Sequence, residues 1–145
     1  MEIKNKKAYF DYEILESFEA GIVLKGTEIK SIRDGKVNLK DSYAVIKNNE
    51  VFLLNTHISQ YKEGNIFNHD TNRSRKLLLN KKEIKKISQE IELNGLTLIP
   101  LKGYFKDSKF KILLGVCRGK KNFDKRETIK NRDIEREVKK RLKNY

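Results

Sequence analysis

The first part of the chain alternates apolar and polar residues in the manner of β-strands. Across Tyr9–Glu16 every second residue from Phe10 to Ile14 is apolar, which predicts a strand with one buried face. A second apolar stretch follows at Phe18–Leu24, where Gly21 would permit a bulge or a bend. We therefore expect strands over this region.

Turn-forming residues mark a first predicted hairpin in the middle of the chain. The apolar-rich stretches Ser42–Ile46 and Val51–Leu54 flank Asn48-Asn49, a pair that accepts the left-handed backbone of a tight turn. A brief strand is predicted over Lys76–Leu79, and the long stretch Ser59–Asn72 has no apolar period and is expected to be a polar loop.

A second hairpin is predicted near the end of the apolar part of the chain. Leu96–Lys106 and Lys109–Cys117 are separated by Asp107-Ser108, which again suits a tight turn. Pro100 has no N–H to give to a strand partner, so its position should be an edge or a bulge. Cys117 ends the second strand and is expected to be a small core residue.

Two short helices are predicted between the strands. Thr27 can cap a helix that runs to Arg33 and stops at Gly35. Asn80, with Glu83 at the third position after it, forms a capping-box signal for a second helix that ends at Asn94-Gly95. The isoleucines of this second helix lie on one face and are expected to pack on the sheet: Ile84, Ile87 and Ile91.

About six short strands and two short helices predict a mainly β fold. The arrangement that suits them is an OB-fold-like closed antiparallel β-barrel with short flanking helices. Apolar residues make up only 37% of this sequence, so the hydrophobic core should be small. Closure of the barrel is then favourable because it leaves no exposed strand edges to be covered. A chain of 145 residues has the usual length of a single domain.

The distribution of charge divides the chain into a body, residues 1–117, and a basic tail, residues 118–145. The body carries 21 Lys and Arg against 15 Asp and Glu, whereas the much shorter tail carries 12 against 5. The overall net charge of +13 favours a polyanionic partner, because binding to phosphates releases condensed counterions. Charge alone does not separate RNA from DNA, and an anionic membrane surface is also compatible with it.

The tail combines cationic residues with an aromatic one. Lys and Arg at positions 118, 120, 121, 125 and 126 can reach phosphates, and Phe123 offers a face for stacking on an unpaired base. Further on, Ile129, Ile134, Val138 and Leu142 form a narrow apolar stripe in a highly charged segment. Because an isolated helix of this kind is marginal in water, we expect a tail that is disordered alone and helical against a partner. A solvated basic linker is the alternative interpretation.

Residues that could support catalysis do not form a recognised constellation. His69-Asp70 is the best candidate pair, but the sequence contains only one other histidine and no metal-ligand spacing, phosphate loop or nucleophile elbow. We therefore predict a protein that is not an enzyme and that uses no metal, cofactor or small-molecule substrate. The lone Cys117 and the polar start Met1–Lys7 suggest a cytoplasmic protein without a membrane segment.

Charged residues near the first predicted helix form a candidate binding surface. Lys30 and Arg33 share one helix face and can span adjacent phosphates. Glu19 and Glu28 lie beside them, where a carboxylate either accepts hydrogen bonds from bases and riboses or neutralises neighbouring lysines. The sequence leaves these two interpretations open.

Several ordered motifs resemble one known family over essentially the whole chain. The main ones are Phe18-Glu19-Ala20-Gly21-Ile22-Val23-Leu24, Gly26-Thr27-Glu28-Ile29-Lys30-Ser31-Ile32-Arg33, Gly35-Lys36-Val37-Asn38-Leu39-Lys40-Asp41-Ser42-Tyr43, Asn68-His69-Asp70, Gly95-Leu96-Thr97-Leu98-Ile99-Pro100-Leu101, Arg118-Gly119-Lys120-Lys121 and Asp124-Lys125-Arg126. Together they resemble the SsrA-binding protein (small protein B) family.

The resemblance implies a function in ribosome rescue. It implies an OB-fold-like barrel that binds the tRNA-like domain of transfer-messenger RNA (SsrA RNA) and helps to deliver it to stalled ribosomes for trans-translation. It also implies that the tail enters the decoding site and the empty messenger channel of the ribosome. The alternative that we keep is a generic OB-fold protein that binds single-stranded nucleic acid.

The resemblance also suggests which residues make these contacts. The expected RNA-binding residues are Lys6, Lys7, Tyr12, Glu19, Glu28, Lys30, Arg33, Asn38, Lys40 and Leu78. The expected ribosome-binding residues of the tail are Gly119, Lys120, Lys121, Phe123, Asp124, Lys125, Arg126 and Ile134. The chain departs from the family pattern at Tyr9 and Phe10, where Arg and His are common, at Thr71, where Pro is usual, and at Phe123, where His or Tyr is frequent.

Overall fold

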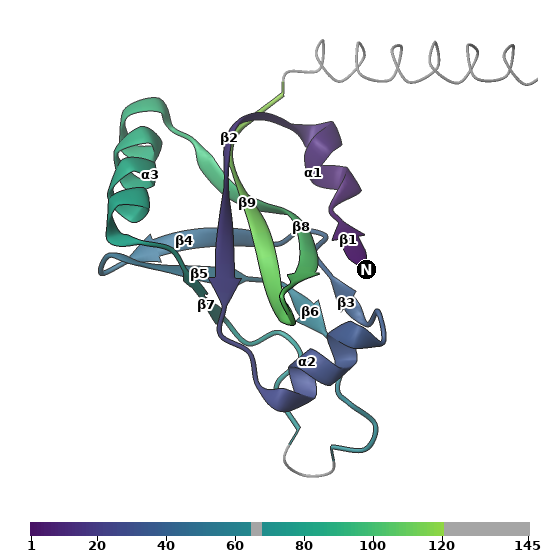
Figure 1. The fold of residues 1–145 in the computed structure, drawn as a ribbon. Helices are drawn as coiled ribbons and strands as arrows, with labels where there is room; N and C mark the ends of the chain where they lie inside the picture. Colours follow the sequence, from purple (N-terminus) through teal and green to yellow (C-terminus); the bar gives the residue numbers. More distant parts are fainter. Residues whose placement is uncertain (65–67, 121–145) are drawn as a thin grey trace, which may run out of the picture.

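The computed structural model describes residues 1–64 and 68–120 (Figure 1). Along the chain the elements are β1 (Glu2–Lys4), α1 (Lys6–Asp11), β2 (Tyr12–Ile22), α2 (Gly26–Arg33), β3 (Val37–Asn38), β4 (Tyr43–Lys47), β5 (Glu50–Leu54), β6 (His57–Ile58), β7 (Arg75–Leu78), α3 (Lys81–Asn94), β8 (Thr97–Lys106) and β9 (Lys109–Gly119). The described part of the predicted loop Ser59–Asn72 contains no helix or strand, as expected.

Six antiparallel strands close into a ring in the order β8, β4, β5, β7, β2 and β9. The ring closes because β9 pairs with both β2 and β8. Its narrowest joint is between β4 and β8, which pair only through Ala44 and Leu98. β1 pairs with β8 from Lys102 to Tyr104, and β3 pairs with β6 in a separate two-stranded sheet. The predicted mainly β, barrel-like fold of about six strands is thus confirmed.

The two predicted hairpins are confirmed, and their turn residues explain them. Asn48 and Asn49 have φ values of 53° and 61°, and Asp107 and Ser108 have values of 51° and 66°. Two successive left-handed residues make the kind of tight turn whose twist matches that of antiparallel strands, and Asn and Asp tolerate that backbone better than most residues. The turn chemistry therefore sets the register of both hairpins.

α3 begins and ends where the sequence predicts. The side chain of Asn80 accepts a hydrogen bond from the Glu83 N–H at 2.8 Å, and the Glu83 carboxylate accepts one from the Asn80 N–H at 3.3 Å. Gly95 ends the helix in the left-handed conformation, with φ of 61°. Ile84 and Ile87 are buried in the core, and Ile91 packs against it. The isoleucine face therefore contributes to packing on the ring, as predicted.

α2 lies at one end of the ring (Figure 1), and its residue Ile32 is buried in the core. The prediction that Thr27 caps this helix is wrong, because the N-cap residue is Lys25. The Lys25 N–H donates to the Glu28 carboxylate at 2.8 Å, which is why the helix begins at Gly26. The Thr27 hydroxyl lies 2.9 Å from Nδ1 of His69 instead.

The strand predicted over Tyr9–Glu16 is wrong for its first residues. Tyr9 to Asp11 belong to α1, and a single strand, β2, then runs from Tyr12 to Ile22. The irregularity in this strand is a register shift between Ile14 and Glu16, so of the bulge or bend predicted at Gly21, the bulge is not found there. At Pro100 the prediction is confirmed, because the pairing of β8 with β9 shifts between Pro100 and Lys102.

The last strand extends further than predicted. Cys117 is fully buried, as expected of a core residue, but β9 continues to Gly119, so Arg118 and Gly119 belong to the sheet. The N–H of Lys120 then donates to the Asp11 carbonyl at 2.9 Å. The predicted tail residues Lys121, Phe123, Asp124, Lys125, Arg126 and Ile134 lie outside the described residues. Within the described part, no helix is long and apolar enough to cross a bilayer.

Candidate nucleic-acid interface

The predicted RNA-binding residues fall into two groups on the described surface. Lys6, Lys7, Tyr12, Asn38 and Lys40 lie around α1 and the turn between β3 and β4. Glu19, Lys30, Arg33 and Leu78 lie around α2 and the β8–β9 hairpin. The remaining candidate, Glu28, is buried.

Asn5 holds α1 against the ring. It is buried, and its side-chain N–H groups donate to the carbonyls of Pro100 at 2.9 Å and Leu39 at 3.2 Å. Its side-chain oxygen accepts from the N–H of Ala8, which caps the first turn of α1. One asparagine therefore ties α1 both to β8 and to the residue that follows β3. This placement presents Lys6 and Lys7 on the exposed side of the helix.

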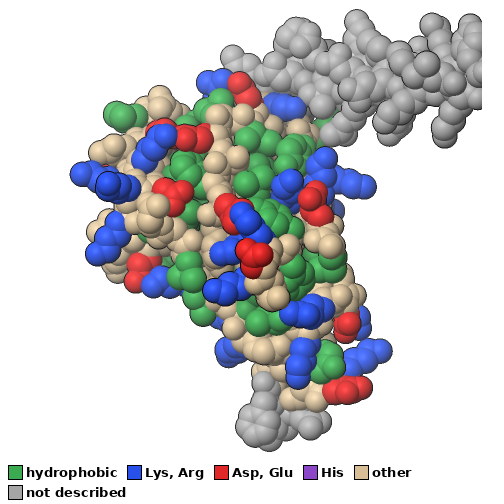
Figure 2. Space-filling model, in the orientation of Figure 1, with side chains coloured by type: hydrophobic (Ala, Val, Ile, Leu, Met, Phe, Trp, Pro, Cys, Tyr) green, Lys and Arg blue, Asp and Glu red, His purple; other side chains and the backbone are tan. Residues whose placement is uncertain are grey.

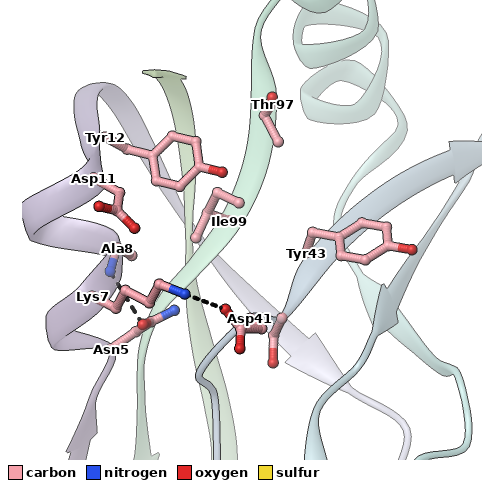
Figure 3. A pocket seen from close by; sticks show the side chains of 10 residues that line it. Asn5, Lys7, Ala8, Asp11, Tyr12, Asp41, Tyr43, Thr97 and Ile99 are labelled. Atoms are coloured by element: carbon pink, nitrogen blue, oxygen red, sulfur yellow. Dashed lines mark hydrogen bonds and ion pairs between the residues drawn. The ribbon is translucent and has the colours of Figure 1, made fainter. Parts of the chain in front are cut away.

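A cleft of about 270 Å³ opens between α1, β4 and β8, and we call it the α1 cleft (Figure 3). Lys7 Nζ lies 2.7 Å from Asp41 Oδ1 across it, and both side chains are at least half exposed. The hydrogen bond between them raises the pKa of Lys7 and lowers that of Asp41. Tyr12 and Tyr43 stand on facing sides of the cleft, with Ile99 between them. A cation and two aromatic rings are the groups that bind a phosphate and an unstacked base.

Asn38 and Lys40 extend this group along the turn. The Asn38 side-chain oxygen accepts a hydrogen bond from the Lys40 N–H at 2.8 Å, a short-range bond typical of asparagine in turns. Both residues are exposed, and Lys40 contributes to lowering the pKa of the neighbouring Asp41. The turn thus carries a second cation beside the Lys7–Asp41 pair.

Glu19 lies on the outer face of β2 and is held by residues of β8. The Tyr104 hydroxyl donates to Glu19 Oε2 at 2.8 Å, and Lys106 Nζ lies 3.5 Å from the same oxygen. The hydrogen bond from Tyr104 is the main reason why the pKa of Glu19 is lowered. Burial, followed by this hydrogen bond, raises the pKa of Tyr104 to about 12. Glu19 is therefore a preset acceptor on an exposed position of β2, and both of these contacts are made to one of its two oxygens.

Lys30 and Arg33 extend from α2 over aromatic rings. Lys30 Nζ lies 5.4 Å from the centre of the Tyr61 ring, and Arg33 Cζ lies 5.2 Å from that of Phe105. Because side chains alternate along a strand, Phe105 faces α2 while Tyr104 reaches Glu19 on the other face of the hairpin. Arg33 and Glu19 thus sit on two sides of one hairpin. Sequence reasoning missed Tyr104, Lys106 and Phe105, since nothing local links them to residues so far away along the chain.

Leu78 is an exposed apolar residue at the end of β7. Half of its surface, 51%, is accessible to solvent, although it lies opposite Gly21 in the sheet. It lines the hollow formed by β2, α2 and the β8–β9 hairpin. An exposed leucine among cations suits contact with a ribose or a base face.

The prediction that Glu28 contacts RNA is corrected by the structure. Its carboxylate is fully buried and accepts hydrogen bonds from Arg73, from Arg75 and from the Lys25 N–H. Burial alone would raise the pKa of Glu28, but these hydrogen bonds outweigh it and the pKa is lowered. Of the two interpretations left open, charge neutralisation holds for Glu28. The cations that it neutralises are Arg73 and Arg75, and not the expected lysines. Glu28 is an organising residue of the core.

His69 also has a structural position. It is buried, with Nε2 2.9 Å from the Ile58 carbonyl and Nδ1 2.9 Å from the Thr27 hydroxyl. Nδ1 thus ties the long loop to α2 and Nε2 ties it to β6, and Asp70 beside His69 is exposed. Among the described residues no cluster of His, Cys, Asp and Glu has the arrangement of a metal site.

Charge on the visible face of the molecule is dispersed. Figure 2 shows Lys and Arg side chains spread among acidic and hydrophobic ones, with no single cationic patch. The fold and these exposed cations and aromatic rings define a class: a small, basic, mainly β protein whose surface suits a structured polyanion.

Comparisons with known proteins identify the family. The family model of the SmpB protein matches residues 2–144. The SsrA-binding protein of Ligilactobacillus salivarius is 58% identical over 142 residues, covering 98% of this chain and 92% of that protein. That of Lacticaseibacillus casei is 59% identical over 140 residues, covering 97% and 89%.

A solved structure agrees with this result. A chain from the structure described as "tmRNA-SmpB: a journey to the center of the bacterial ribosome" matches with a TM-score of 0.70 and 48% sequence identity, covering 83% of this chain and 85% of that one. The present chain belongs to the SmpB protein family, to which the SsrA-binding proteins belong.

Proposed function

We propose that this protein binds the tRNA-like domain of transfer-messenger RNA and brings it to stalled ribosomes for trans-translation. The observation that carries the proposal is the match over 98% of the chain to a relative named for binding SsrA RNA. The similar chain of known structure is described together with that RNA and the ribosome. The protein performs no bond chemistry in this function, and it acts in the cytoplasm, where ribosomes work.

The two exposed groups of residues have complementary roles in this proposal. Lys7, Lys40, Lys30 and Arg33 contact phosphates, and their positions around α1 and α2 let them follow a folded backbone. Glu19 accepts hydrogen bonds from base edges or ribose hydroxyls, because Tyr104 and Lys106 occupy only one of its oxygens. The ring of Tyr12 stacks on a base, and Leu78 makes an apolar contact with a ribose or a base face. Phosphate contacts supply affinity, whereas Glu19, Tyr12 and Leu78 select the RNA fold.

The tail has a separate role in the proposal. Gly119 ends β9, and Lys120 is tied by its N–H to Asp11 and by Nζ to the Tyr9 carbonyl at 3.2 Å. Residues beyond this anchor carry the ribosome contacts, from Lys121, Phe123, Asp124, Lys125 and Arg126 to Ile134. They occupy the decoding site and the empty messenger channel, and tethering to the ring raises their effective concentration there.

A competition titration tests this function. The full chain is titrated into labelled transfer-messenger RNA at about physiological salt, with an unrelated structured RNA and a homopolymer single strand as competitors. The proposal predicts that transfer-messenger RNA binds at least ten times more tightly than either competitor. Equal affinity for the unrelated structured RNA contradicts it, and preference for the homopolymer supports the generic single-strand binder instead.

A salt titration adds a count of the phosphates involved. If about five phosphates are neutralised on duplex-like RNA, the logarithm of the binding constant falls with the logarithm of salt at a slope of about −4 to −5. A slope near zero would mean that the exposed lysines and arginines are not the source of affinity.

A further inference from the structure

A groove beside α3 adjoins the candidate interface and shares only Leu78 with it. The groove has a volume of about 760 Å³ and runs between α3, β7 and the β4–β5 turn (Figure 1). Its floor is aliphatic and includes Leu78, Leu79 and Ile84. The cations that line it are Lys76, Lys81 and Lys85, and we call it the α3 groove.

Two of these lysines carry charge that no neighbouring group balances. Lys76 lies 3.2 Å from Glu50, the one acidic residue of the lining, so that pair is internally balanced. Lys81 and Lys85 are exposed, and within residues 1–64 and 68–120 neither forms an ion pair. No acidic residue stands three or four positions from either of them along the sequence. The groove therefore keeps two uncompensated positive charges.

Lys81 and Lys85 stand one helical turn apart on the same wall of the α3 groove. Residues four apart on a helix lie on one face, with Cβ atoms roughly 5–6 Å apart, and like charges at this spacing repel one another. Both lysines lie in the first half of α3, whose N-terminal end carries the partial positive charge of the helix dipole. A ligand with carboxylates one helical turn apart relieves both unfavourable interactions. The electrostatics of this wall therefore favour such a ligand.

The lining of the α3 groove suits a protein segment better than a strand of RNA. Unpaired bases are bound by stacking on aromatic or arginine side chains, and the described lining contains neither. Glu50 also places a carboxylate at the groove, which disfavours phosphates there. An aliphatic floor beside a charged wall is instead the setting in which an amphipathic helix lays its apolar face into a groove.

We propose that the α3 groove docks an acidic amphipathic helix of a partner protein. The aliphatic side chains of that helix contact the floor, and two of its carboxylates, one turn apart, pair with Lys81 and Lys85. Leu78 lines both this groove and the hollow between β2, α2 and the β8–β9 hairpin, so the partner stands beside an RNA bound on the α2 side. The docking surface goes beyond the proposed function and does not depend on it, because neither lysine belongs to the predicted RNA contacts.

Synthetic peptides test the docking surface on the full chain. The probe is a labelled helical peptide that carries two Glu residues one turn apart beside a stripe of leucines, and its control is a peptide of the same composition in scrambled order. Anisotropy titrations compare the unchanged protein with K81Q/K85Q and with K62Q/K82Q, which removes two exposed charges outside the groove lining. Thermal unfolding of all three proteins should be equal, because the four lysines are exposed. Amide NMR shifts of the unchanged protein locate the bound peptide.

The proposal predicts that the amphipathic peptide binds the unchanged protein at least tenfold more tightly than the scrambled one. K81Q/K85Q should weaken this binding roughly five- to tenfold, and K62Q/K82Q by less than about twofold. The amide shifts should gather at Leu79, Lys81, Ile84 and Lys85. Equal affinity for the two peptides overturns the docking surface, as does an equal loss in the two double variants, since either result reflects only the attraction of acid to a chain of net charge +13. Shifts at the same residues that a structured RNA causes and the peptide does not would assign the groove to RNA and overturn it as well.

Discussion

Arg75 donates a hydrogen bond from Nε to Oε2 of Glu28, and neither side chain has any surface exposed to solvent. Arg75 also donates to the carbonyls of Thr56 and Thr71, and Arg73 donates to the other oxygen of Glu28. The cluster joins α2 to β7 and to the loop before it. Since α2 carries Lys30 and Arg33, this buried pair fixes the position of half of the candidate interface.

Removing the negative charge of Glu28 should destabilise the protein severely. E28Q leaves the buried guanidinium of Arg75 without a counter-charge, a situation that typically costs about 3–5 kcal/mol. Denaturant unfolding of both proteins measures the difference. The matched control is E50Q, which breaks the exposed Lys76–Glu50 pair and should change stability by at most about 1 kcal/mol. Equal effects of the two substitutions would contradict the structural role of Glu28.

Glu28 should also make stability depend on acidity. Its pKa is lowered in the folded protein from the ordinary value of 4.5, so the deprotonated form stabilises the fold. That contribution is complete above the unfolded-state pKa and is lost as the pH falls through the lower folded-state value. The free energy of unfolding should therefore fall in the unchanged protein as the pH drops below the ordinary value of 4.5, and less steeply in E28Q. Parallel pH profiles for the two proteins would refute this.

Gly103 marks a position where the sheet and an aromatic ring meet too closely for any side chain. A Cβ atom on Gly103 would lie 2.4 Å from Cζ of Phe110, whose ring is buried in the core. G103A should therefore cost about 1–3 kcal/mol through overpacking. The control is G26A, because a Cβ on Gly26 meets nothing within 4 Å and the residue begins α2. Thermal unfolding separates the two, and a neutral G103A would show that the Phe110 ring moves freely.

Shortening the chain should separate RNA binding from work on the ribosome. A variant that ends at Lys120 keeps all of β9 and should fold and bind transfer-messenger RNA, but it should not support peptide tagging in a reconstituted translation reaction. A variant that ends at Cys117 loses the pairing of Arg118 and Gly119 with β2, including the ion pair of Arg118 with Glu13 at 2.7 Å, and should be less stable. Tagging by the first variant would exclude the proposed role of the tail.

Local chemistry made much of this fold predictable. Both hairpins follow from turn residues that accept a left-handed backbone, and α3 follows from the capping box of Asn80 and Glu83 and from Gly95. α1 was not predictable in this way. The residue that fixes it, Asn5, acts through carbonyls of Leu39 and Pro100, which are far away along the chain. The alternation around Tyr12 is real but belongs to a strand that begins after the helix.

The candidate site was predictable in its exposed cations but not in their partners. Lys30 and Arg33 share a helix face that the sequence alone reveals. Glu28 lies on the same short helix, yet its burial depends on Arg73 and Arg75, which reach it from a distant strand and loop. Glu19 is likewise defined by Tyr104, a partner across the sheet. Local patterns therefore find which residues carry charge, whereas long-range pairing decides which of them face the solvent.

Hydroxyl-radical footprinting of transfer-messenger RNA shows whether the ring of strands presents a specific interface to that RNA. The RNA is probed alone, with the full chain, and with a variant in which Lys30 and Arg33 are replaced by Gln on the exposed side of α2. We predict protection confined to the tRNA-like domain, and weakened by K30Q/R33Q at the same nucleotides. Protection spread evenly along the RNA, or absent at saturating protein, would contradict a specific interface on this ring of strands.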